Sequence, residues 1–178
     1  MKILVLNGSV SKNSVPLVAM HLSQDYDVAT EVIVNEDLAI MKQKYDIWEH
    51  VPDSELLGPL NDVVEYSKDL ISDIEPTLLV GINFGCAIIN TLISEGSWSG
   101  SAIMVDPDGV FFLDKETINY NKKCVWFVRK NDKSFVRKNL SKLPLFKLGT
   151  TIYVNDEDDM KNLHTMTMIK NVAGSLCS

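Results

Sequence analysis

The chain has 178 residues, of which 46% are apolar and 23% are charged, so it can form one globular domain with a substantial core. Its net charge of −7 argues against a nucleic-acid partner. No run approaches the roughly 20 consecutive apolar residues that a membrane-spanning helix needs. Three cysteines, Cys86, Cys124 and Cys177, lack metal-ligand spacing, which predicts free thiols and no metal site. We therefore expect a soluble cytoplasmic protein with one domain over residues 1–178.

Short apolar runs alternate with segments of helical periodicity along most of the chain. In chain order, the expected elements are strand Ile3–Leu6, a helix from Ser14, strand Val28–Val34, helix Pro59–Ile74, strand Thr77–Gly81, helix Cys86–Ile93, strand Ala102–Val105, strand Cys124–Val128, helix Ser134–Leu140, strand Thr151–Val154 and helix Asp159–Ala173. Residues 35–58 show no clear period, and we expect a cap or irregular insertion there, with room for one short helix.

Six strands with helices between most of them predict an α/β fold of three layers, in which helices cover both faces of a mostly parallel sheet. Ligands of such sheets bind beyond the carboxyl ends of the strands. Polar residues gather at those ends: Asn7-Gly8, Asn83, Asp106, Asp132 and the segment 155–164. The edge formed by these ends is therefore the expected place for a site.

The turn between strand Thr77–Gly81 and the next helix reads Gly81-Ile82-Asn83-Phe84-Gly85. Glycines on both sides allow a strand and a helix to pack tightly, while the middle residue projects from a strained turn. This turn resembles the nucleophile elbow of α/β-hydrolases, Gly-x-nucleophile-x-Gly. Asn83 stands where a working hydrolase has Ser, Cys or Asp. Asn tolerates a positive φ better than most residues, but its amide is not a useful nucleophile.

The resemblance to α/β-hydrolases extends to the order of further motifs. Asn7-Gly8 is similar to the family's oxyanion-hole turn, and Met104-Val105-Asp106-Pro107 matches a strand end that often follows the elbow. The resemblance implies triad positions in the family order nucleophile, acid and histidine at Asn83, Asp132 and His164. It also implies oxyanion or ligand-binding roles for Asn7, Gly8 and Phe84. The usual two leading antiparallel strands are absent, as in small, cap-poor members.

These residues together predict a degenerate hydrolase that binds a small molecule or a protein, with little or no turnover and no cofactor. Two alternatives stay open. One is an active esterase or thioesterase relative with an unusual catalytic group. The other is an FMN reductase of flavodoxin-like fold, because Leu6–Ser14 resembles the phosphate loop of that family. Against FMN, the family's aromatic flavin-binding loop after the third strand is replaced here by Gly81–Gly85.

Each candidate residue also has a purely structural interpretation. His164 could be a surface side chain, Asp132 a solvated charge and Asp106 a turn cap, while Cys86 is expected to be a buried, inert thiol. The carboxylates of 156–159 precede a helix, where acidic residues usually interact with the helix dipole. The sequence does not identify a ligand or an oligomeric state.

Overall fold

Six parallel strands form one sheet in the order β2-β1-β3-β4-β5-β6. The computed structural model describes residues 1–8, 17–33, 36–45, 51–107, 122–130, 140–141, 143–155 and 160–177. The strands are β1 (Lys2–Gly8), β2 (Asp27–Val32), β3 (Leu78–Asn83), β4 (Ser101–Val105), β5 (Cys124–Arg129) and β6 (Thr150–Val154). The predicted fold class is confirmed, with a sheet that is parallel throughout.

The central strands are apolar along their whole length because helices cover both sides of the sheet. Successive side chains of a strand point to opposite faces. In β1, accordingly, Leu4 and Leu6 belong to one buried cluster, whereas Ile3 and Val5 belong to the other. All four of these side chains are fully buried.

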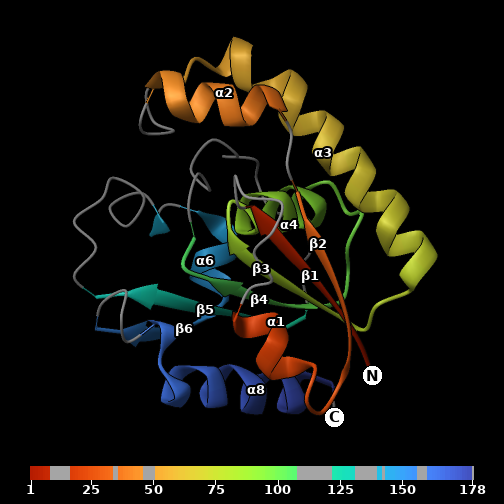
Figure 1. Cartoon of the computed structure of the whole chain (residues 1–178), viewed down its shortest axis with the longest axis vertical. Coiled ribbons are helices and arrows are strands. Elements are labelled where there is room, and N and C mark those ends of the chain that lie inside the picture. The colour runs from red at the N-terminus through yellow and green to blue at the C-terminus, as the bar shows by residue number, and fades with distance from the viewer. Residues whose placement is uncertain are drawn as a thin grey trace.

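The helices divide between the two faces of the sheet (Figure 1). The helices of the described chain are α1 (Leu17–Leu22), α2 (Glu36–Tyr45), α3 (Asp53–Ile74), α4 (Gly85–Ser94), α6 (Pro144–Leu148) and α8 (Leu163–Cys177). Buried side chains of α2, α3, α4 and α6 pack in one cluster, and those of α1 and α8 pack in the other. In the part of the chain that the structure describes, no helix is both long and apolar enough to cross a membrane.

The described residues of segment 35–58, which are 36–45 and 51–58, are more regular than the sequence suggests. The segment contains α2 and the start of α3, which begins at Asp53 rather than at the expected Pro59. Pro52 precedes the helix in an extended conformation, and its carbonyl accepts hydrogen bonds from the N–H groups of Glu55 and Leu56. Leu56 is 1% exposed, so burial favours the extra turn even though Pro59 then lies inside the helix.

Figure 1 shows α2 lying beyond the ends of β1 and β2 toward which their arrows point. Helix α2 therefore lies next to the carboxyl edge of the sheet, while the role of segment 35–58 as a cap over a ligand stays a prediction. The short helix α6 was not expected from the sequence. The expected helix Ser134–Leu140 lies outside the described residues, apart from Leu140.

Candidate functional site at the carboxyl edge of the sheet

The turn that carries Asn83 joins β3 directly to α4. Asn83 has a φ of 52°, in the left-handed region, and Phe84 caps α4 with a φ of −64°. A left-handed residue between a strand and a helix produces the sharp bend that the sequence predicts. Asn is one of the few non-glycine residues that adopt this conformation readily.

The backbone of this turn is pressed against the end of β1. A Cβ atom on Gly85 would clash with the carbonyl oxygen of Leu6, and one on Gly8 would clash with Cβ of Phe84. Only glycine allows these approaches. Gly8 is also paired with Asn83 in the ladder between β1 and β3. The structure therefore places Asn7, Gly8, Asn83 and Phe84 next to one another, while their role in a site stays a prediction.

Asp106 lies beside Asn83 on the neighbouring strand end, because Ile82 pairs with Val105 in the ladder between β3 and β4. Its φ is 48°, so two adjacent strands end in a left-handed, non-glycine residue. Strained residues of this kind cluster at functional sites. The two adjacent left-handed residues, Asn83 and Asp106, mark this part of the carboxyl edge as the candidate site.

The side chain of Asp106 takes part in an ion pair rather than simply capping a turn. Its Oδ1 accepts a hydrogen bond of 2.6 Å from Nε of Arg129, at the end of β5. The side chain of Asp106 is 19% exposed and that of Arg129 is 29% exposed, so water screens the pair only in part. Sequence reasoning missed Arg129, because only the register of β4 against β5 brings it to Asp106.

The atoms of Asn7 and Phe84 are largely enclosed. Both residues are 4% exposed. The carbonyl of Asn7 accepts a hydrogen bond of 2.9 Å from the N–H of Ile33, and the carbonyl of Phe84 accepts one from the N–H of Ala87. These bonds fix the backbone around the turn. The oxyanion role of Asn7, Gly8 and Phe84 stays a prediction.

The described structure shows no contact between Asn83 and the other two predicted triad positions. Asp132 lies outside the described residues. His164 is exposed in the first turn of α8, and helical spacing places it on the side opposite the buried Met166 and Ile169. No hydrogen bond among the described residues joins His164 to Asn83. The triad grouping therefore stays a prediction.

Cys86, next to the turn, and Cys124, at the amino end of β5, are both enclosed thiols. Cys86 is fully buried, and its Sγ lies 3.3 Å from the carbonyl oxygen of Gly81, to which it donates a hydrogen bond. Burial raises the pKa of the Cys124 thiol well above its usual range. Neither thiol has the exposed, electropositive surroundings that activate a nucleophilic cysteine.

No family model matches this sequence, and no curated protein is similar to it in sequence. Solved structures are similar in fold. The structure of YahD with malic acid aligns with a TM-score of 0.67 at 8% identity, over 98% of this chain and 93% of YahD. The esterase domain of a Rhodothermus marinus protein aligns with a TM-score of 0.61 at 12% identity, over 99% of this chain and 87% of that domain.

A third structure of the same kind is MGS-M1, an α/β-hydrolase enzyme from a Medee basin deep-sea metagenome library. It aligns with a TM-score of 0.54 at 14% identity, over 98% of this chain and 82% of the enzyme. The chain therefore has an α/β-hydrolase-like fold. Five of its strands share the order 2-1-3-4-5 with flavodoxin-like proteins, but β6 extends the sheet beyond that order.

Proposed function

We propose that this protein is a degenerate α/β-hydrolase that binds a ligand at the carboxyl edge of the sheet with little or no turnover. The observation that carries the proposal is Asn83 in a left-handed turn between β3 and α4. This conformation supports the assignment of residue 83 to the position of the attacking group in this fold. The tight contacts of Gly8 and Gly85 around it favour a retained elbow. The amide side chain replaces the reactive group while the surrounding backbone keeps its shape.

The chemistry of an amide supports binding rather than covalent catalysis. In a triad the histidine takes a proton from the nucleophile as it attacks the substrate carbonyl. The amide of Asn83 has no such proton to give up, but it can donate and accept hydrogen bonds. Losing the nucleophile of a triad lowers kcat by roughly four to six orders of magnitude.

A hydrolase that uses Cys86 instead of Asn83 is the less favoured candidate. Cys86 lies in the first turn of α4, where the helix dipole would favour a thiolate. However, its sulfur is fully buried and directed at the carbonyl of Gly81. A substrate could not reach it without displacing the elbow. A flavoprotein is disfavoured by the sixth strand, and a purified protein that stays colourless with added FMN would exclude it.

Small carboxylates are the first ligands to examine. The solved structure of YahD contains malic acid, and the present chain has Arg129, in its ion pair with Asp106, at the same edge as Asn83. A guanidinium recognises carboxylates well. We further propose a cytoplasmic location and no nucleic-acid or membrane partner, in keeping with the net charge of −7.

The binding role can be tested by calorimetric titration of the protein with malate, other small carboxylates and short acyl esters. We expect saturable binding of at least one such ligand to the wild-type protein. Asn83→Trp should abolish it by filling the turn with a large side chain. The control is Asn171→Trp on the exposed side of α8, which should leave binding unchanged. Binding that survives Asn83→Trp would place the ligand elsewhere and contradict the proposal.

A further inference from the structure

Strand β6 forms one outer edge of the sheet, at the end opposite to β2. Figure 1 shows β6 on the side of the molecule away from α3. Among the strands of the described chain, only β5 pairs with β6, so the outer side of β6 has no partner strand. An open edge of this kind is a template for pairing with another chain unless the strand is protected.

The register of β6 against β5 identifies the backbone groups that point outward. The carbonyl of Val154 accepts a hydrogen bond from the N–H of Lys130, just after β5, so the backbone groups of Val154 face β5. The N–H and C=O groups of a strand residue point to one side, and those of the next residue point to the other. The backbone groups of Ile152 therefore also face β5, whereas those of Thr151 and Tyr153 point away from the sheet.

The sequence of β6 lacks the features that usually protect an edge strand, which are charged side chains, proline and bulges. Thr150–Val154 contains no charged residue and no proline, and it pairs with β5 residue by residue without a bulge. The side chain of Tyr153 is 50% exposed. β-Branched and aromatic residues such as these pair well across strands, so the edge favours a partner strand.

The opposite edge of the sheet is protected by charge. β2 contains Asp27 and Glu31, and Tyr66 of α3 donates a hydrogen bond of 3.2 Å to Glu31. A second copy paired along β2 would bring these carboxylates toward their counterparts, in a protein whose net charge is already −7. Pairing through β6 brings no charged strand residues together, so the edge at β6 is compatible with a second copy of this acidic chain.

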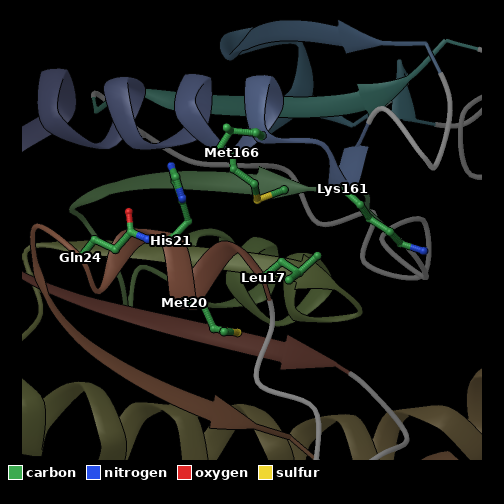
Figure 2. A pocket seen from close by; sticks show the side chains of 7 residues that line it. Leu17, Met20, His21, Gln24, Lys161 and Met166 are labelled. Atoms are coloured by element: carbon green, nitrogen blue, oxygen red, sulfur yellow. The ribbon is translucent and has the colours of Figure 1, made fainter.

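A different exposed apolar surface lies between α1 and α8. Figure 2 shows Leu17 and Met20 on α1, and Met166 of α8 pointing toward α1. A surface of flexible side chains sets neither the direction nor the register of a partner. The backbone groups of β6 set both, and they therefore specify the partner more closely.

We propose that this protein forms a symmetric dimer in which the β6 strands of two copies pair in antiparallel orientation. A two-fold axis beside Ile152 puts Thr151 of each copy opposite Tyr153 of the other, and each of these pairs exchanges both of its backbone hydrogen bonds. Ile152 lies opposite its counterpart between them. The two sheets become one continuous sheet that ends in a β2 strand on each side. Because those ends are protected by charge, growth stops at the dimer.

Sedimentation equilibrium of the wild-type protein at several concentrations tests the proposal. A single strand pair gives a small interface, and small interfaces are transient, so we expect a reversible equilibrium between monomer and dimer. The average mass should rise with concentration from one chain toward two chains and no further. Concentrations up to about 1 mM detect dissociation constants into the millimolar range. A protein that stays monomeric throughout, or that grows beyond two chains, would overturn the proposal.

Thr151→Pro tests the backbone pairing, because proline removes an outward N–H and leaves the hydrogen bonds between β5 and β6 in place. Two-fold symmetry removes the hydrogen bond twice, so we expect dimerisation to weaken by about tenfold or more. The matched control is Thr30→Pro in β2. The N–H groups of Asp27 and Ile33 donate to β1, so the N–H of Thr30 points outward by alternation. Thr30→Pro should leave dimerisation unchanged, and an equal loss in both variants would contradict pairing through β6.

A pair of charge substitutions tests the antiparallel register without proline. Tyr153→Lys puts a cation on an exposed position, so the fold should persist while dimerisation weakens severalfold. Adding Thr151→Glu to this variant should recover most of the loss, because position 153 of one copy lies opposite position 151 of the other. If the double variant dimerises no better than Tyr153→Lys alone, the proposed register is wrong.

Discussion

Asn83 and Glu75 share a left-handed backbone with a φ of 52°, but they lie in different surroundings. Glu75 is an exposed residue at the end of α3, where its N–H donates a hydrogen bond of 2.9 Å to the carbonyl of Ile71. Asn83 lies between a strand and a helix and is paired with Gly8. For a residue with a side chain, the left-handed conformation is less stable by roughly 1–2 kcal/mol.

This shared conformation gives a prediction at both positions. Glu75→Gly should raise the free energy of unfolding by about 1 kcal/mol, because glycine adopts a positive φ without strain. Asn83→Val should lower it by roughly 1–2 kcal/mol, because a β-branched side chain fits this conformation poorly. Urea unfolding measures both. If Asn83→Val proved as stable as the wild type, residue 83 would not be held in the left-handed turn.

At the scale of elements, the candidate site depends on how closely β1, β3 and α4 approach one another. The contact between Gly85 and the backbone of Leu6 leaves no room for a methyl group. Backbone atoms cannot move aside as a flexible side chain can. This contact therefore fixes the position of Asn83 relative to Gly8.

Gly85→Ala should lower the free energy of unfolding by about 2–3 kcal/mol, since β1 or α4 must shift. The matched control is Gly58→Ala in α3, where an added Cβ would meet nothing within 4 Å. That change should stabilise the protein by about 1 kcal/mol, because alanine favours a helix more than glycine does. Both values come from chemical denaturation, and similar effects of the two substitutions would contradict the tight packing of the elbow.

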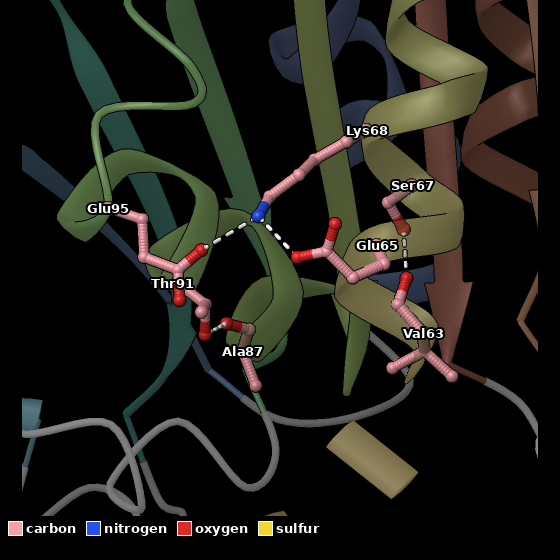
Figure 3. Close-up of polar contacts among 7 residues, drawn as sticks. All are labelled: Val63, Glu65, Ser67, Lys68, Ala87, Thr91 and Glu95. Atoms are coloured by element: carbon pink, nitrogen blue, oxygen red, sulfur yellow. Dashed lines mark hydrogen bonds and ion pairs between the residues drawn. The ribbon is translucent and has the colours of Figure 1, made fainter. Parts of the chain in front are cut away.

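Helix α3 is joined to its neighbours by polar contacts at its surface (Figure 3). Lys68 forms ion pairs with Glu65 of the same helix at 2.6 Å and with Glu95, just after α4, at 3.2 Å. Hydrogen bonds to Glu65 and then Glu95 raise the pKa of Lys68. On the other side, Tyr66 donates a hydrogen bond of 3.2 Å to Glu31 of β2. Burial, followed by the charge of Glu31, raises the pKa of Tyr66.

These shifts predict a loss of stability in alkali. A group with a raised pKa in the folded state contributes stability that is complete below its unfolded pKa and is lost as the pH rises through its folded pKa. The ordinary values are 10.5 for Lys68 and 10.0 for Tyr66, so the loss should begin near pH 10. Both residues are solvent-screened, and the effect should be modest.

The measurement is urea unfolding at several values between pH 8 and about 11.5. The double variant Lys68→Met, Tyr66→Phe should show a shallower decline than the wild type. Lys147→Met is the control, because Lys147 lies on α6, away from α3. If the free energy of unfolding fell equally with pH in the double variant and the wild type, the contacts of Lys68 and Tyr66 would not be the cause of the loss of stability in alkali.

The strands and the bend at Asn83 could be predicted from the sequence, because their own residues determine them. Continuous apolar runs placed the strands, and the two glycines around Asn83 identified the bend. The start of α3 could not be read in this way, because Pro59 looks like a helix start unless the burial of Leu56 is known. The pairing of Asp106 with Arg129 depends on the register of β4 against β5, which a single sequence does not specify.

At the scale of the whole molecule, the candidate binding region lies at the carboxyl edge of the sheet. Gly8, Asn83 and Asp106 align there across neighbouring strands. The three-layer fold supplies a rigid frame for this edge.

The central claim is that an inert amide occupies the place of the attacking group. The most direct measurement is kcat for hydrolysis of p-nitrophenyl butyrate by the wild-type protein, compared with Asn83→Ala. Because working enzymes commonly reach about 1–1,000 per second, the wild type should stay below about 0.001 per second and match Asn83→Ala. A wild-type kcat near 1 per second or above that disappears in Asn83→Ala would contradict the claim.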